Sequence, residues 1–239
     1  MNTIAITAAT AKEISSLVSI AGAAERKVQG SEAVYEGKCG RQKIVLAITG
    51  IGKVNTASAL TELLGRYSPD LLINTGCAGA YDGSSLAVGD LAIATAEIYG
   101  DEGVLTPSGW EPLDCIGIPL LKAQGKNYFN ELPISPDLVD RAARFAAAQA
   151  ISLRSGKFIT VSTCSGTSAR GAELASRFGA ICENMEGAAS AHVALMNGVG
   201  FLEIRGISNI VEDRDLSRWD IDRACENVQC FIRSFIESL

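Results

Sequence analysis

A carboxylate and a carboxamide near the C-terminal end of the chain are the residues best placed to do chemistry. Glu186 lies at the end of segment 180–187 and Asn209 at the end of segment 201–209, and each segment contains an apolar, strand-like run. The helical stretch 188–197 between them completes a βαβ unit, and open α/β sheets bind ligands beyond the carboxyl ends of their strands. A carboxylate accepts hydrogen bonds from two sugar hydroxyls, and an amide both donates to and accepts from a base edge. Together the two side chains predict a nucleoside site.

Glu13 is a second candidate, because it follows the apolar run 3–8 and therefore lies at the carboxyl end of another predicted strand. A carboxylate in this position could be the general base that activates a water molecule. It also suits the start of a helix, where the helix dipole stabilises a negative charge. The residues themselves favour neither interpretation.

Two small-residue turns follow other predicted strands. The turn 49–55 either brings backbone N–H groups towards a ligand or is only a tight strand-to-helix connection, and it fits neither a P-loop nor a dinucleotide fingerprint. The small residues of 73–80 allow the backbone to approach a planar ligand, so Cys77, Ala78 and Gly79 are predicted to form a wall of the site. No histidine base accompanies Cys77, which argues against a nucleophilic role.

A polar loop at 163–167 brings Ser165 to a further strand end. Arg170, Arg205 and Arg214 are the cations to consider around the site. The charged segment 211–215 that contains Arg214 is most simply a solvated loop, but it follows Asn209 directly, so Arg214 is within reach of a ligand.

Composition restricts the class of protein. The chain has 239 residues, 47% of them hydrophobic, and a net charge of −6. A sizeable core can therefore be buried, and the negative charge argues against nucleic acid or an anionic membrane as a partner. The first residues lack the features of a signal peptide and no run reaches the length of a membrane span, so we expect a cytoplasmic protein.

The seven cysteines are scattered, and the only histidine is His192. Without a ligand spacing, a zinc site is not expected. Most of the cysteines are predicted to be small buried residues in a reducing compartment, and His192 to be a helix residue that packs locally.

The elements that must position these residues alternate along the chain. Near-continuous apolar runs predict strands covered on both faces, at 3–8, 43–49, 71–74, 91–96, 158–162 and in the two segments that hold Glu186 and Asn209. Helices are predicted at 52–67, 137–150, 168–178, 188–197 and 220–239. This order predicts one α/β domain over 1–239, a three-layer αβα sandwich with a central mixed, largely parallel sheet.

Segment 98–136 interrupts the alternation, with five of the six prolines and the aromatic residues Trp110 and Tyr128. Long irregular segments inside compact domains are usually functional. We interpret it as a lid that covers a base or ring, with a surface excursion of no role as the alternative.

Four segments together resemble the nucleoside phosphorylase and nucleosidase superfamily, over nearly the whole chain. They are 49–55 (TGIGKVN), 74–79 (NTGCAG), 184–188 (NMEGA) and 205–209 (RGISN), in this order. Within the superfamily the chain is most similar to the futalosine hydrolases and secondarily to the methylthioadenosine/adenosylhomocysteine nucleosidases. Both groups cleave the bond between a purine and ribose with water.

The resemblance implies roles for individual residues. It places ribose on Met185 and Glu186, the water-activating glutamate at Glu13 and the purine anchor at Asn209. It also implies a homodimer or larger homo-oligomer, a small nucleoside substrate, and a reaction that needs no metal or organic cofactor.

Two departures from the adenine-specific nucleosidases decide the expected substrate. Those enzymes carry Asp at the anchor position and Glu two residues before the ribose glutamate, where this chain has Asn209 and Asn184. An amide can donate to O6 or N7 of a 6-oxopurine but has no ionisable proton for adenine. The expected reaction is hydrolysis of futalosine in menaquinone biosynthesis, which releases hypoxanthine and dehypoxanthine futalosine.

The alternatives are an adenine nucleosidase, a purine nucleoside phosphorylase and a nucleoside-binding module without catalysis. Phosphate as the nucleophile requires cations, whereas the loops in question hold Glu13 and Asn74, and a carboxylate repels phosphate. Futalosine also carries a carboxylate beyond the ribose 5′ position. Arg214 is the predicted partner of that group, with Arg170 as second choice, and a solvated surface arginine as the alternative for Arg214.

Overall fold

A ten-stranded mixed sheet runs through the molecule in the computed structural model, which describes residues 2–26, 28 and 30–239. The strand order is β11-β6-β12-β13-β5-β1-β4-β3-β2, and β14 pairs with both β5 and β6. The strands are β1 (Thr3–Ala8), β2 (Ala24–Arg26), β3 (Ala33–Cys39), β4 (Gln42–Ile48), β5 (Leu71–Ala80), β6 (Leu91–Tyr99), β7 (Gly103–Thr106), β8 (Gly109–Pro112), β9 (Leu121–Ala123), β10 (Lys126–Tyr128), β11 (Glu131–Pro133), β12 (Leu153–Thr160), β13 (Ala180–Asn184) and β14 (Gly200–Ile210).

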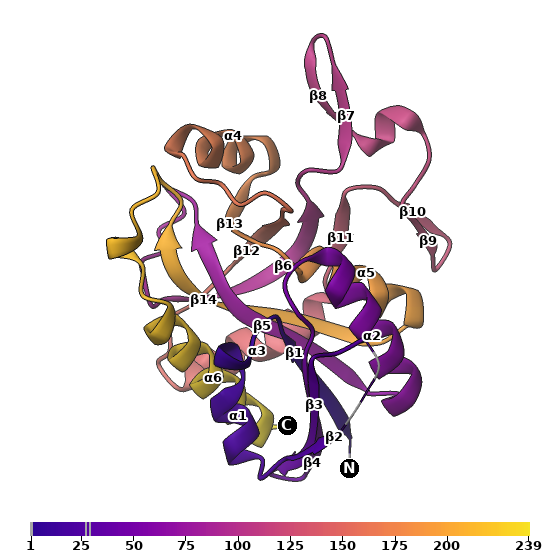
Figure 1. Ribbon diagram of the computed structural model, residues 1–239, viewed down its shortest axis with the longest axis vertical. Helices are drawn as coiled ribbons and strands as arrows, with labels where there is room; N and C mark the ends of the chain where they lie inside the picture. The colour runs from indigo at the N-terminus through magenta and orange to yellow at the C-terminus, as the bar shows by residue number, and fades with distance from the viewer. Residues whose placement is uncertain (1, 27, 29) are drawn as a thin grey trace.

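Helices cover both faces of this sheet, as Figure 1 shows, with α1 and α6 on one side and α2 and α5 on the other. They are η1 (Ala11–Glu13), α1 (Ser15–Ile20), α2 (Lys53–Tyr67), η2 (Leu113–Ile116), α3 (Pro136–Ala148), α4 (Ser168–Phe178), α5 (Gly187–Asn197), η3 (Leu216–Arg218) and α6 (Ile221–Glu237). The predicted three-layer α/β fold is confirmed. Because both faces are covered, central strands such as β4 and β14 are almost entirely buried.

Parallel pairing holds the centre of the sheet. β1 pairs in parallel with β4 and β5, β12 with β6 and β13, and β14 with β5. The antiparallel pairs are β2–β3–β4 and β6–β11 at the edges, and two short contacts, β13–β5 and β14–β6. These short contacts close β5, β14, β6, β12 and β13 into a ring, which brings strand ends far apart in the sequence to one place.

Strand β5 continues well beyond its predicted end at residue 74. The segment 75–80, predicted as a turn, is the second half of β5, and it stays paired with β14 up to the partners Ile210 and Ala80. Gly76 makes this possible, because its φ of +141° lies in a region that L-residues rarely adopt. The small residues therefore form a strand that lines the site instead of a loop above it.

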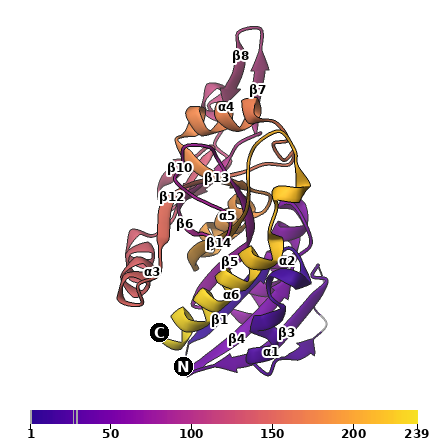
Figure 2. The same ribbon diagram turned by 90° about the vertical axis from the view of Figure 1, so that its left-hand side faces the viewer.

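Segment 98–136 contains the short hairpins β7–β8 and β9–β10 and the edge strand β11. Figures 1 and 2 both show the β7–β8 hairpin projecting from one end of the molecule. Trp110 on β8 packs edge-on against Phe178 at the end of α4, with ring centroids 5.6 Å apart, and the Arg177 guanidinium lies 4.6 Å from its ring centroid. The aromatic side chain that was predicted to cover a base therefore packs on α4.

The cysteines are less buried than predicted. Cys39, Cys182 and Cys225 are buried, Cys77 is half-buried, and the others are exposed (Cys115, Cys164 and Cys230), so the prediction that most are buried is wrong. A cysteine count carries no information on which face of an element each residue occupies. In the described part of the chain, no helix is long and apolar enough to cross a membrane.

His192 on α5 has the local packing role that was predicted. Its Nδ1 lies 3.1 Å from the hydroxyl of Tyr99, and the two rings meet edge-on. Burial lowers the pKa of the imidazole, so His192 is neutral at physiological pH.

Candidate active site

A cavity of about 540 Å³ lies at the carboxyl ends of β1, β5, β13 and β14. This is the edge of the sheet where α/β folds bind ligands, and the volume is typical of a small-molecule site. Nine of the predicted site residues line it: Glu13, Cys77, Ala78, Gly79, Ser165, Asn184, Met185, Glu186 and Asn209.

Glu186 is held in the floor of the cavity as the residue that precedes α5. Its side chain is buried, Oε1 accepts a hydrogen bond from the backbone N–H of Gly52 at 3.0 Å, and Oε2 lies 3.5 Å from both Nη1 and Nη2 of Arg205. Burial raises the pKa of the Glu186 carboxyl, and Arg205 acts in the opposite direction. The glycine-rich turn 49–55 thus supplies an N–H group to a protein carboxylate.

Arg205 lies beneath Glu186 and is itself 1% exposed. Its Nε donates to Glu203 at 2.8 Å and its Nη2 to the side-chain oxygen of Asn74 at 2.7 Å. Burial acts to lower the pKa of the guanidinium, but the carboxylates of Glu203, Glu186 and Glu13 raise it above the ordinary value. Arg205 therefore stays charged and orients Glu186 from below.

Glu13 ends η1, and its carboxylate is fixed by three donors. Oε2 accepts from the backbone N–H and the hydroxyl of Thr10, both at 2.9 Å, and Oε1 accepts from the backbone N–H of Cys77 at 3.0 Å. The contact with Thr10 is a capping box, so the helix-start interpretation is correct in part. A carboxylate has about four lone-pair sites, which leaves one for a water molecule in the cavity.

Gly76 permits the approach of Glu13 to β5. A Cβ atom at this position would collide with Oε1 of Glu13 and would lie 2.9 Å from Nη1 of Arg205. Only a glycine therefore allows the carboxylate to reach the N–H of Cys77. This requirement was not apparent from the sequence, in which Gly76 is one small residue among several.

Asn209 is turned towards the cavity by an irregularity in the register of β14 and β5 between Ile207 and Asn209. The hydroxyl of Ser208 donates to Oδ1 of Asn209 at 2.8 Å, and Nδ2 of Asn209 donates to the carbonyl of Ile210 at 3.2 Å. An NH₂ group has two hydrogens, so one N–H of Asn209 remains for a ligand. Ser208, which also lines the cavity, was missed at the sequence level.

Ser165 lies in the cavity wall, but its hydrogen bonds go to Glu183. The backbone N–H and hydroxyl of Ser165 donate to Glu183 at 2.7 and 2.6 Å, and the hydroxyl of Tyr81 donates to the same carboxylate at 3.0 Å. Glu183 is a cavity residue that was also missed. It fixes the loop 163–167 on β13.

Cys77 is a wall residue, as predicted. Its Sγ lies 3.4 Å from Sγ of Cys225 on α6, and the contact with Cys225, followed by burial, raises the pKa of the Cys77 thiol. A thiol that resists ionisation is a poor nucleophile.

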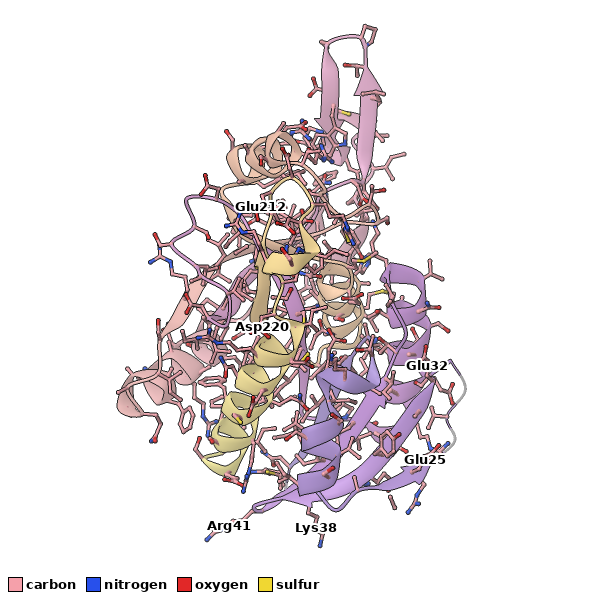
Figure 3. The ribbon with its side chains drawn as sticks, turned by 60° about the vertical axis from the view of Figure 1, so that its left-hand side comes forward. Glu25, Glu32, Lys38, Arg41, Glu212 and Asp220 are labelled. Atoms are coloured by element: carbon pink, nitrogen blue, oxygen red, sulfur yellow. The ribbon has the colours of Figure 1, made fainter. Side chains whose placement is uncertain are left out.

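Arg214 is the one predicted site residue that does not line the cavity. Arg214 is exposed and does not line the cavity; its guanidinium lies 5.0 Å from the ring centroid of Trp219. Figure 3 labels Glu212 in the same loop, above Asp220 at the start of α6. Arg170, the second choice, pairs with Glu173 on α4 at 2.8 Å. The segment after β14 brings Trp219 and Ile221 to the cavity instead of Arg214.

The mouth of the cavity has residues that the sequence did not single out. They are the cation Lys12, the aromatic Trp219 and the apolar Ile51 and Ile221. Among the described residues that line the cavity, Lys12 is the one cation, and it pairs with Asp222 at 2.6 Å. Glu13, Glu183 and Glu186 line it as well.

Comparison with known proteins agrees with this architecture. The sequence matches the phosphorylase superfamily over residues 3–237. It is 34% identical over 188 residues to the futalosine hydrolase of Thermus thermophilus, which covers 79% of each chain. It is also 34% identical over 219 residues to the 5′-methylthioadenosine/S-adenosylhomocysteine nucleosidase of Halalkalibacterium halodurans, covering 88% of this chain and 86% of the relative.

The fold has a close counterpart in a solved structure. The 5′-methylthioadenosine/S-adenosylhomocysteine nucleosidase of Neisseria meningitidis, in complex with methylthio-immucillin-A, superposes with a TM-score of 0.86 at 25% identity over 100% of both chains. The resemblance that the four sequence segments carry is confirmed by these matches. The chain belongs to the phosphorylase superfamily.

Proposed function

We propose that this protein hydrolyses the N-glycosidic bond of a 6-oxopurine nucleoside, with futalosine as its substrate. Relatives named as nucleosidases of two kinds, at equal identity, support an N-glycosyl hydrolase. The side chain of Asn209 is the observation that favours futalosine over an adenine nucleoside as the substrate. Ser208 and Ile210 fix its amide with one N–H unused, and such a donor suits O6 or N7 of hypoxanthine.

In the proposed reaction, cleavage builds positive charge on the ribose ring and negative charge on the departing base. Glu186 accepts hydrogen bonds from the ribose hydroxyls, and its negative charge stabilises the sugar cation. Asn209 donates to the leaving purine. Glu13 accepts a proton from the attacking water through its remaining lone pair.

Water is favoured over phosphate by the charges that line the cavity. Three carboxylates, Glu13, Glu183 and Glu186, face it, and the one cation among the described lining residues is Lys12, already paired with Asp222. Lys53, next to the glycine-rich turn, is bound by Asp101 and Glu102 at 2.6 and 2.7 Å. A dianion in this cavity would be repelled.

The test is base release from futalosine, inosine and methylthioadenosine, with and without phosphate, followed by chromatography. We expect the protein to release hypoxanthine from futalosine at a rate that does not depend on phosphate. Faster release of adenine from methylthioadenosine would identify the second candidate, which the longer match to that nucleosidase favours. A sugar 1-phosphate product would identify a phosphorylase, and binding without release would identify a binding module.

Lys12 replaces Arg214 as the residue proposed to meet the carboxylate of futalosine. It lines the mouth of the cavity beside Trp219 and Ile221, and its ammonium can exchange Asp222 for a substrate carboxylate. Because Lys12 is exposed, the contact is screened, and Lys12→Ala should lower kcat/KM for futalosine by roughly 2- to 5-fold at low salt. Inosine, which lacks the carboxylate, should be unaffected.

The matched control is Lys38→Ala, an exposed lysine that Figure 3 shows at the lower end of the molecule, below Glu212 and Asp220. This variant should leave kcat/KM unchanged for both futalosine and inosine. An equal loss on futalosine and inosine in Lys12→Ala would show that Lys12 supports the mouth of the cavity without contacting the carboxylate.

A further inference from the structure

We propose that Glu97 and Glu203 form a buried carboxyl–carboxylate pair that holds one proton between them and positions Glu186, the proposed ribose-binding residue. The positioning part of this inference rests on the proposed function. The shared proton does not, and it can be measured without a substrate.

The first observation is an excess of buried carboxyl groups. Glu97, Glu203 and Glu186 are 0%, 0% and 4% exposed. Glu203 and Glu186 both contact the buried guanidinium of Arg205, and Glu97 lies against Glu203. If all three carboxylates were ionised, the one guanidinium could not compensate their charge in a low-dielectric interior, which is strongly unfavourable. Binding a proton removes one of these charges.

The second observation is an unpaired oxygen. Oε1 of Glu203 accepts from Nε of Arg205 at 2.8 Å, whereas Oε2 of Glu203 is buried without a hydrogen-bond donor. Both oxygens of Glu97 are occupied, Oε1 by Nδ2 of Asn184 and Oε2 by the hydroxyl of Thr160, each at 2.7 Å. A buried acceptor without a hydrogen-bond donor destabilises the folded protein. If this oxygen binds a proton, it becomes an O–H donor instead.

The third observation places the two groups against each other. A Cβ atom on Gly187 would collide with Oε1 of Glu97 and with both carboxylate oxygens of Glu203, so these atoms enclose the same small space. Burial first, and then Glu203, raises the pKa of Glu97 well above its ordinary value. A proton between Oε1 of Glu97 and Oε2 of Glu203 satisfies every oxygen of the pair.

The other titratable groups around the pair are Arg205 on β14, Glu186 before α5, Cys182 on β13 and Tyr99 on β6. Burial raises the pKa values of Cys182 and Tyr99, so both are neutral near pH 7. Arg205 remains charged. The shared proton therefore leaves one negative charge on the pair, and the carboxylates of Glu186 and Glu13 also act on the guanidinium.

The pair reaches Glu186 by two routes. Glu97 accepts from Nδ2 of Asn184 and thereby turns Oδ1 of Asn184 towards the backbone N–H groups of Glu186 and Gly187, at 2.9 and 2.7 Å. Glu203 holds Arg205, whose Nη1 and Nη2 face Oε2 of Glu186. One route fixes the main chain of Glu186 and the other its carboxylate, so we regard Glu97 and Glu203 as positioning residues.

Glutamine substitutions distinguish the two members of the pair. In Glu203→Gln, the new NH₂ can donate to Glu97 where the proton was, while the amide oxygen still accepts from Arg205. This variant should keep KM for the cleaved nucleoside within about twofold of wild type. In Glu97→Gln, an NH₂ group replaces one carboxylate oxygen, so the variant loses one of the two hydrogen bonds that Glu97 accepts, from Nδ2 of Asn184 or from the hydroxyl of Thr160. This variant should raise KM about tenfold, the loss expected for a hydrogen bond to a charged group, with kcat changed less.

The pH dependence of unfolding tests the proton directly. A carboxyl with a raised pKa binds more protons in the folded state than in the unfolded state, so the free energy of unfolding falls as pH rises above the ordinary glutamate value of 4.5. The slope of the free energy of unfolding against pH measures how many more protons the folded state binds. In Glu203→Gln this number should be lower by about one. Infrared spectra at pH 7 should show the carbonyl stretch of a protonated carboxyl in the wild type and not in Glu203→Gln.

The control is Glu131→Gln, which alters an exposed glutamate paired with Lys157 and should keep both the slope and the infrared band. An unchanged slope and band in Glu203→Gln would overturn the shared proton. A wild-type KM in Glu97→Gln would overturn the positioning role. If the wild type cleaves no nucleoside, the proposed function fails, while the slope and the infrared band still decide whether the proton is there.

Discussion

Replacing Glu13 by glutamine is expected to lower kcat by roughly 10²-fold or more, the contribution typical of a general base. The glutamate uses three of its lone-pair sites to hold its position against Thr10 and Cys77, and the fourth faces the cavity. An amide cannot take a proton from water. Steady-state kinetics with futalosine measure the loss, and binding of a substrate analogue should be largely kept.

The helix-capping role of Glu13 must be separated from this effect. Urea unfolding of Glu13→Gln reports the cost of weakening the capping box, about 0.5–2 kcal/mol for helix caps in general. Glu25→Gln, on the exposed edge strand β2, is the matched control and should change neither kcat nor stability. In Glu13→Ala, added formate should restore part of the rate, because a small carboxylate can enter the space left by the side chain. Near-normal kcat in Glu13→Gln would leave Glu13 with the capping role alone.

Replacing Asn209 by aspartate is the second change with a large expected effect. The aspartate keeps the shape of the side chain but removes the N–H donor to the leaving purine, which is worth about 10²–10³-fold in kcat for comparable preorganised donors. The kcat for futalosine and for inosine should therefore fall by about 10²–10³-fold. Methylthioadenosine should become a better substrate, because a carboxylic acid can donate to N7 and its carboxylate can accept from a 6-amino group.

The measurement is kcat/KM for the 6-oxo and 6-amino substrates with each variant. Asn127→Asp, an exposed residue on β10, introduces the same charge outside the cavity and should leave both values unchanged. If Asn209→Asp lowers kcat/KM equally for the 6-oxo and the 6-amino substrates, Asn209 is not the contact that discriminates between them. Ser208→Ala should lower this discrimination to a smaller extent, because Ser208 orients the amide.

The sequence by itself determined the fold class and half of the residues that line the candidate site. Apolar runs separated by amphipathic helices were sufficient for the three-layer α/β architecture, because a strand covered on both faces must be apolar throughout. Polar residues at the ends of those runs, such as Glu186 and Asn209, identified the edge of the sheet that binds ligands. The parallel order of the central strands then brings those ends together.

The tertiary structure decided which side chains meet. The continuation of β5 through Gly76, and the register shift that turns Asn209 inward, depend on pairing with a strand more than a hundred residues away, and local pattern does not encode such pairing. Arg214 follows Asn209 closely in the chain but does not line the cavity, since distance along the chain does not predict direction in space. The contact of Glu97 with Glu203 arises only when β6 and β14 close the ring of strands. In the sequence, Glu97 and Glu203 are ordinary acidic residues. Only their burial side by side makes a bound proton necessary to remove one of the two negative charges.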